Sequence, residues 1–273
     1  MPASENLKRV IVAVIAIPLI LLTAYLGSYY FFSFVTLVAL VSYYEFFLLA
    51  KNKSANANLI LGEIIIFLFL LNQLLNFIDI NTLLLLSLLS LLTTELFRNK
   101  GSALFNLGVT FLGIFYIGFF SASIIALREF YPDVVDNYIN GGYLVISILA
   151  SIWIGDSAAY FFGTALGKHK LFPRVSPKKS WEGAIFGFIF SLGTMIFVRF
   201  ILMDFLSLWN VIIIGIIIGS VGQIGDLVES LFKRDSAVKD SSSFIPGHGG
   251  FFDRFDSLIF SAPVIWMYLK YFS

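Results

Sequence analysis

Two carboxylates follow a glycine-rich turn near the end of the chain. Asp253 and Asp256 are three residues apart, so a helix beginning here would carry both on one face. Carboxylates held close together repel one another unless a cation or a proton lies between them. The turn before them contains His248, Gly249 and Gly250 and could direct backbone N–H groups toward an anion. The stretch therefore predicts a cation held beside phosphate.

The expected cation is a hard divalent ion. Mg²⁺ usually binds through one or two carboxylates together with substrate phosphates. The chain has no cysteine, and its two histidines are His169 and His248, so a zinc site of the usual nitrogen and sulfur type is not expected. The sequence predicts Mg²⁺, with Mn²⁺ as an alternative, and leaves room for a second, monovalent cation. A metal ringed by Lys, Arg and a glycine turn indicates phosphoryl or nucleotidyl transfer.

A preceding segment, GSVGQIGDLVESLFKR, could complete this site. It carries Gln223, Asp226, Ser230 and Lys233 at i, i+3, i+7 and i+10, which is a polar stripe along one helix face. An ionisable residue such as Asp226 inside an apolar run is costly and indicates a functional site. The glycines at every third position of this segment are interpreted as helix-packing positions.

Two further segments carry candidate residues. WIGDSAAYFFG places Asp156 inside an apolar run, where it either faces a polar cavity or hydrogen-bonds a neighbouring helix for packing. SPKKSWEG places Lys178 and Lys179 just before Ser180, a predicted helix N-cap. These lysines could bind phosphate at the helix N-terminus, or they could contact anionic lipid head groups. The charged stretch after Lys233 could likewise be only a loop ordered by ion pairs.

These residues belong to a strongly apolar chain. Of its 273 residues, 59% are hydrophobic and 13% are charged, and the mean hydropathy is +0.91. Soluble domains are about 25% charged. The composition therefore predicts an all-α, polytopic integral membrane protein. A net charge of +1 gives no indication of a nucleic-acid partner.

Nine apolar runs approach the roughly 20 residues that a membrane-spanning helix needs. With the N-terminus in the cytoplasm and the C-terminus outside, only Arg128, Arg199 and Lys270 of the 18 Lys and Arg residues lie outside, as the positive-inside rule favours. The first run lacks a small-residue cleavage site and is interpreted as an uncleaved anchor. The predicted spans are 7–26, 29–49, 58–77, 80–97, 102–127, 142–166, 183–203, 208–230 and 255–272.

The two halves of the chain differ in their connections. Residues 1–127, with about five spans and short connections, are interpreted as a scaffold. Residues 128–273, with about four spans, carry two basic cytoplasmic loops at 167–182 and 231–254 and are interpreted as the catalytic half. The acidic residues of the first half are interpreted as solvated or interfacial carboxylates: Glu45, Glu63 and Glu95.

The second half resembles a known family. From Ser230 to Asp256 the chain follows the spacing S-x2-K-R-x4-K-D-x-S-x2-I-P-x-H-G-G-x2-D-R-x-D. This resembles the signature of the bacterial phosphatidate cytidylyltransferases, also called CDP-diacylglycerol synthases. WIGDSAAYFFG and SPKKSWEG are similar to segments of the same family, whereas residues 1–127 resemble it only in being apolar.

The resemblance implies an enzyme that converts CTP and phosphatidic acid into CDP-diacylglycerol and pyrophosphate. The lipid phosphate would attack the α-phosphorus of CTP with the help of Mg²⁺. It also implies a homodimer in the inner membrane with a cytoplasmic active site. The residues carried over as metal ligands are Asp226, Asp253 and Asp256, and the other catalytic residues are Asp156, Lys239 and Asp240. The residues carried over as substrate-binding are Lys178, Lys179, Ser180, Ser230, Lys233, Arg234, His248, Gly249, Gly250 and Arg254.

Two other functions fit parts of the sequence. A CTP-dependent lipid kinase of the polyprenol or phytol kinase type would attack a different phosphorus and would release CDP. A transporter would also explain carboxylates and glycines inside the spans. Transport, however, gives no reason for a clustered phosphate-binding loop.

Overall fold

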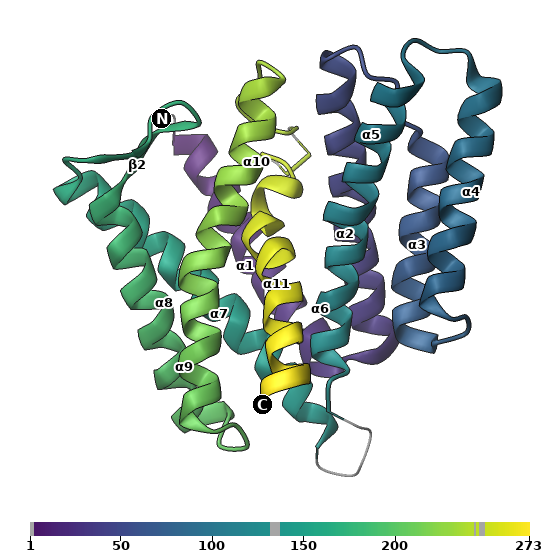
Figure 1. The fold of residues 1–273 in the computed structure, drawn as a ribbon. Helices are drawn as coiled ribbons and strands as arrows, with labels where there is room; N and C mark the ends of the chain where they lie inside the picture. Colours follow the sequence, from purple (N-terminus) through teal and green to yellow (C-terminus); the bar gives the residue numbers. More distant parts are fainter. Residues whose placement is uncertain (1–2, 132–136, 243, 246–248) are drawn as a thin grey trace.

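Long helices account for most of this computed structural model, which describes residues 3–131, 137–242, 244–245 and 249–273. The helices run side by side along one common direction (Figure 1). The helical elements are α1 (Ala3–Leu26), α2 (Ser28–Asn52), α3 (Leu59–Leu75), α4 (Ile80–Arg98), α5 (Ala103–Gly113), η1 (Ile114–Phe119), α6 (Phe120–Arg128), α7 (Tyr138–Leu166), α8 (Trp181–Leu202), α9 (Leu208–Ile217), η2 (Ile218–Gly222), α10 (Gln223–Asp235) and α11 (Phe252–Phe272).

Six helical segments in the described part of the chain are long and apolar enough to cross a membrane. Two shorter apolar helices, Val10–Leu26 and Leu59–Leu75, lie among them. The prediction of a polytopic membrane protein is therefore confirmed. The six segments are Ser28–Asn52, Ile80–Arg98, Ala103–Arg128, Tyr138–Leu166, Trp181–Leu202 and Leu208–Asp235.

Small residues allow α7 and α8 to pack closely. The Ser151 hydroxyl donates to the Ser191 carbonyl at 2.6 Å, and the Ser191 hydroxyl donates to the Ser151 carbonyl at 3.1 Å. A Cβ at Gly155 would overlap the Ser191 hydroxyl, so a larger residue there would force the two helices apart. Helix association in membranes depends on such close packing and on polar contacts, because lipid is as apolar as the helix surfaces.

The segments η1 and η2 are π-helical and interrupt two of the long helices. Such interruptions are frequent at functional sites. After η2, α10 approaches α11 so closely that a Cβ on Gly225 would lie 2.6 Å from the Cβ of Phe260. This approach brings Asp226 on α10 toward the start of α11.

The predicted loop 167–182 contains a short antiparallel hairpin, which an all-α prediction did not include. Its strands are β1 (Lys170–Phe172) and β2 (Ser176–Ser180). The carboxylate of Glu182, in the first turn of α8, accepts hydrogen bonds from the backbone of Lys168 and His169. Prolines within this loop disfavour helix, so an extended hairpin satisfies its backbone instead.

Helix α11 brings the two halves of the chain together. It packs against α10 of the second half and against α2 and α6 of the first. Aromatic side chains are in contact at this junction. The ring centroids of Phe34 and Phe255 are 5.7 Å apart, and those of Tyr116 and Phe260 are 5.8 Å apart. The β-hairpin, the end of α10 and the beginning of α11 all lie at one end of the molecule (Figure 1).

Candidate functional site

Carboxylates from three helices approach one another near the start of α11. Asp156 on α7 and Asp226 on α10 are close enough to Asp256 on α11 for their charges to repel its charge. The Nζ atom of Lys179, at the end of the hairpin, lies 2.5 Å from Oδ2 of Asp226. Three of the predicted acidic residues thus share one neighbourhood, with a lysine as a partner for one of them.

A small cavity separates the helices below this cluster. Its volume is about 20 Å³, enough for one water molecule, and Asp156, Gln223 and Ser257 are among its lining residues. Gln223 is held in place there, because its amide donates to the carbonyls of Ala184 and Gly219. Asp156 therefore borders a cavity in which Gln223 and Ser257 are polar neighbours and Ile152, Ala159 and Ile218 are apolar ones.

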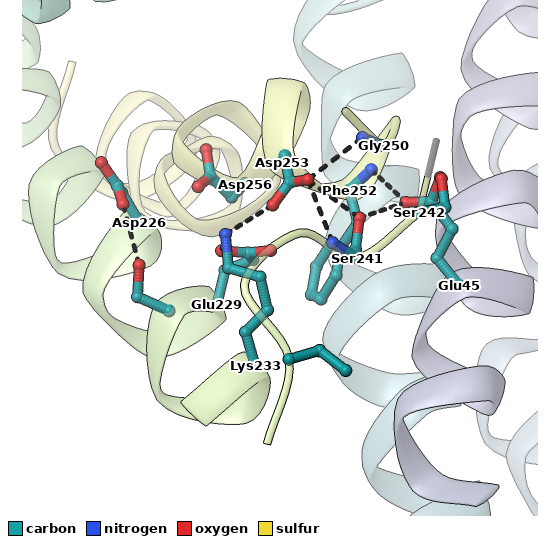
Figure 2. A network of polar contacts seen from close by, with 12 residues as sticks. Glu45, Asp226, Glu229, Lys233, Ser241, Ser242, Gly250, Phe252, Asp253 and Asp256 are labelled. Atoms are coloured by element: carbon teal, nitrogen blue, oxygen red, sulfur yellow. Dashed lines mark hydrogen bonds and ion pairs between the residues drawn. The ribbon is translucent and has the colours of Figure 1, made fainter. Parts of the chain in front are cut away.

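The carboxylate of Asp253 binds Lys233 and the loop that precedes α11. Its Oδ1 atom lies 2.5 Å from the Lys233 Nζ, and its Oδ2 atom accepts hydrogen bonds from the Ser241 N–H, the Ser241 hydroxyl and the Gly250 N–H at 3.1 to 3.2 Å. Figure 2 shows Asp253 among these donors, with Asp256 and Asp226 farther along. Both oxygens of Asp253 are therefore occupied by protein groups.

The three predicted metal ligands do not form a ready-made site. Within the described residues, no group of three or more His, Asp or Glu side chains is arranged to hold a metal ion. Asp226 and Asp256 are nevertheless suited to a cation, because Mg²⁺ commonly takes one or two carboxylates and completes its shell with phosphate and water. The donor chemistry of Asp226 and Asp256 therefore fits Mg²⁺, whereas both oxygens of Asp253 contact protein groups in this structure.

A buried carboxylate on α10 was not among the sequence candidates. The Lys233 Nζ lies 2.6 Å from Oε2 of Glu229 as well as 2.5 Å from Asp253, and the exposed fractions of the three side chains are only 12%, 1% and 9%. Lys233 thus bridges two helices as an ion-pair partner. Glu229 could have been found from its spacing, because it is three residues after Asp226 and four before Lys233, on the same helix face.

The interpretation of Glu45 as a solvated carboxylate was wrong. Its exposed fraction is 0%, and its oxygens accept hydrogen bonds from Ser241, Ser242, Phe251 and Phe252. The sequence contained a signal for the importance of Glu45, because an ionisable residue inside an apolar helix indicates a functional site. The same argument was applied to Asp156.

Glu95 is also buried rather than solvated. It is 7% exposed, its Oε2 pairs with Arg98 at 2.8 Å, and its Oε1 accepts a hydrogen bond from Asn106 at 2.7 Å. Glu63, in contrast, is partly exposed. The solvated alternative is therefore wrong for Glu45 and Glu95 and agrees with the partial exposure of Glu63, while an interfacial position stays a prediction for all three.

The two described glycines of the turn have different roles. The N–H of Gly250 donates to Asp253, and a Cβ at Gly250 would overlap the Ser241 hydroxyl and the Glu45 carboxylate. Gly249 adopts a φ of 82°, which favours glycine, and its carbonyl accepts a hydrogen bond from the Ile245 N–H at 2.9 Å. Gly250 thus permits a close approach, while the predicted ligand His248 lies outside the described residues.

Three candidate residues lie in the second strand of the hairpin: Lys178, Lys179 and Ser180. Ser180 is buried and caps α8, since its hydroxyl accepts a hydrogen bond from the Gly183 N–H at 3.2 Å. Lys178 is exposed, and Lys179 turns inward to Asp226. Only the second of the paired lysines therefore contacts the carboxylate cluster in this structure.

The remaining candidates surround the end of α10. The Ser230 hydroxyl donates to Asp226 at 3.4 Å, and Arg234 donates to the carbonyls of Val175 and Val238, which ties the hairpin to the loop. The other candidates are exposed at the rim of the site: Lys239, Asp240 and Arg254.

Replacing Lys233 by methionine should lower the free energy of unfolding by about 3–5 kcal/mol, because it leaves Glu229 and Asp253 nearly buried without their shared cation. Thermal unfolding of the purified protein in detergent measures this loss. Lys53→Met is the matched control, since Lys53 forms an exposed pair with Asp235 at 3.2 Å that should contribute less than about 1 kcal/mol. Equal losses in the two variants would contradict the assigned role of Lys233.

The chain is similar in sequence to known proteins over nearly its whole length. The chain is 33% identical to the phosphatidate cytidylyltransferase of Staphylococcus haemolyticus over 261 residues, which cover 94% of this chain and 96% of that protein. It is 30% identical to the phosphatidate cytidylyltransferase of Bacillus subtilis over 271 residues, covering 97% and 98%. A model of the cytidylyltransferase family matches residues 7–272. The chain therefore belongs to the cytidylyltransferase family.

Proposed function

We propose that this protein is a phosphatidate cytidylyltransferase, which converts CTP and phosphatidic acid into CDP-diacylglycerol and pyrophosphate. Similarity to proteins of that name extends over nearly the whole chain. The observation that carries the proposal is the position of Lys179 beside Asp226, within the cluster that also contains Asp156 and Asp256. A cation and a charged lysine beside clustered carboxylates, of which Asp256 is buried, suit the binding of a triphosphate.

The reaction needs little proton chemistry from the protein. A phosphate oxygen of phosphatidic acid attacks the α-phosphorus of CTP and forms a new P–O bond. The bond from that phosphorus to the oxygen bridging the α- and β-phosphates breaks, and its electron pair leaves with pyrophosphate. The second ionisation of a phosphate monoester has a pKa of about 6, so the nucleophile is already charged at neutral pH. Positioning and charge neutralisation therefore supply most of the catalysis.

Asp226 and Asp256 would hold a Mg²⁺ ion, for which Mn²⁺ could substitute, and a second, monovalent cation could share the site. Bound there, Mg²⁺ would neutralise charge on the phosphates of CTP. Asp156 adds negative charge from the side of the cavity and favours a cation in the same place. Asp253 would act differently from the sequence prediction, by fixing the loop and Lys233 beside this pair.

The cationic residues would bind the phosphates from the cytoplasmic side. Lys179 could exchange its contact with Asp226 for a substrate phosphate once a metal ion neutralises that carboxylate. Exposed residues of the rim would assist it: Lys178, Lys239 and Arg254. His248 and Gly249 would orient a phosphate rather than act as a general base, with Ser180 and Ser230 supporting the neighbouring helix ends.

The same proposal gives the topology. We infer nine membrane crossings in the cell membrane, with the N-terminus in the cytoplasm and the C-terminus outside, and a homodimer as the assembled form. The beginning of α1 and the end of α11 lie at opposite ends of the molecule, as an odd number of crossings requires (Figure 1). Phosphatidic acid would keep its acyl chains in the bilayer while its head group meets CTP at the cytoplasmic surface.

A product assay tests the activity. Purified protein given CTP labelled at the α-phosphate should transfer the label to lipid and release pyrophosphate, and a chelator should stop both. Asp256→Asn should lower the turnover number by about 100-fold or more. Asp235→Asn is the matched control, because Asp235 lies on the same side of the molecule but is exposed and paired with Lys53. Release of CDP would instead identify a lipid kinase. No transfer of label, with Asp256→Asn behaving like the parent, would leave a transporter.

The cysteine-free sequence permits a direct test of topology. Lys51, near the C-terminal end of α2, and Asp204, just after the C-terminal end of α8, are exposed positions for single cysteines, and the proposed topology puts them on opposite sides of the membrane. In intact cells, a membrane-impermeant maleimide should label Asp204→Cys at once and Lys51→Cys only after permeabilisation. The reverse pattern would overturn the proposed orientation.

A further inference from the structure

Glu45, in the first half of the chain, binds the loop that precedes α11 in the second half. The carboxylate of Glu45, on α2, accepts hydrogen bonds from the hydroxyls of Ser241 at 2.8 Å and Ser242 at 2.5 Å. It also accepts hydrogen bonds from the backbone N–H groups of Phe251 at 3.0 Å and Phe252 at 2.8 Å. Four donors from one loop therefore meet a single side chain that is 0% exposed (Figure 2).

The two backbone donors are the first N–H groups of α11. Such groups have no partner within their own helix, so a nearby carboxylate both satisfies them and interacts favourably with the helix dipole. No side chain of its own caps α11 at its N-cap residue, Phe251. Glu45 therefore supplies the N-terminal cap of the helix that carries Asp253 and Asp256.

The two hydroxyl donors lie at the other end of the same loop. Glu45 therefore joins Ser241 and Ser242 to the residues that begin α11, Phe251 and Phe252. Further contacts hold the surrounding chain to α2: the Ser236 hydroxyl donates to the Leu49 carbonyl at 3.0 Å, and the rings of Tyr44 and Phe244 are 5.9 Å apart.

We propose that Glu45 is a positioning residue for nucleotidyl transfer, which fixes Ser241, Ser242 and the start of α11 relative to Asp226. The tethering of the loop follows from the contacts alone. Its effect on CTP rests on the proposed function, because that function assigns phosphate binding to this loop and to the neighbouring Lys239. Glu45 itself touches no substrate in this account and acts through the groups that it holds.

The first half offers a matched control for this role. Glu95 is also buried and hydrogen-bonded, but its partners are Arg98 and Asn106, which belong to α4 and α5. Its replacement therefore measures the cost of altering a buried carboxylate away from the loop. A difference between Glu45 and Glu95 variants would isolate the contact with the loop from a general loss of stability.

The substitution Glu45→Gln is the sharpest variant. It keeps the shape of the side chain but replaces one accepting oxygen by an amide group that donates, so at least one of the four donors of the loop loses its acceptor. We expect the KM for CTP to rise about tenfold and the KM for phosphatidic acid to change less than about twofold. Glu95→Gln should leave both values within about twofold of the parent.

Hydrogen exchange of the peptide containing Phe251 and Phe252 gives a second readout that does not need activity. Exchange should accelerate about tenfold in Glu45→Gln and remain unchanged in Glu95→Gln, because only the first variant removes the acceptor of these N–H groups. Glu45→Asp keeps the charge but shortens the side chain, so it should give intermediate values and replaces Glu45→Gln if that variant does not fold.

The outcomes of these experiments distinguish the tethering of the loop by Glu45 from the effect of Glu45 on CTP. Faster exchange together with a raised KM for CTP, in the Glu45 variants alone, supports the positioning role. Faster exchange with unchanged kinetics would overturn it and leave Glu45 a structural cap, and unchanged exchange would overturn the tether itself. If the parent protein transferred no CTP label to lipid, the proposed function would fail, while the exchange experiment would still test the tether.

Discussion

A carboxylate inside a membrane protein must find hydrogen-bond donors or an opposite charge, because an isolated buried charge costs several kcal/mol. Much of the structure around the site follows from this constraint. Glu45 takes four donors from one loop, and Asp253 takes three donors and a lysine. Glu229 shares that lysine. The contacts of Glu45, and the ion pair between Lys233 and Asp253, join segments from different helices, so satisfying these charges also fixes the geometry.

The constraint separates two kinds of acidic residue. Glu45 is hydrogen-bonded by neutral protein donors, and Glu229 and Asp253 are paired with Lys233, so these three carboxylates organise the protein. Asp156, Asp226 and Asp256 repel one another and are balanced in part by Lys179, which a substrate phosphate could recruit. A protein that binds a metal and a triphosphate needs the second kind, because only carboxylates with free coordination capacity can accept a cation.

Local sequence patterns predicted the elements well. Apolar runs of the length of a bilayer correspond closely to the observed helices, and the N-cap at Ser180 was predicted, because hydropathy and capping depend on neighbours in the chain. The hairpin at 170–180 was missed, since its strands are short and its pairing is not visible in periodicity. The role of Glu45 was missed for a related reason, because its partners are about 200 residues away in the sequence.

The distinction between Asp253 and Asp256 shows the limit of helical spacing. A spacing of three residues predicts that the two side chains share one helix face. Side chains in the first turn, however, lean toward the helix N-terminus, where unpaired N–H groups attract a carboxylate. Asp253 therefore turns back to Gly250, while Asp256 faces the bundle and is buried. Spacing alone could not separate the two roles.

In the proposed site, Asp226 and Asp256 receive the metal while Asp253 remains bound to Lys233 and the loop. Crystals of the protein with Mn²⁺ and a CTP analogue that cannot react would locate the ion by its anomalous scattering. We expect a peak beside Asp226 and Asp256, with the contact between Asp253 and Lys233 intact. A peak coordinated by Asp253, with Lys233 displaced, would contradict it.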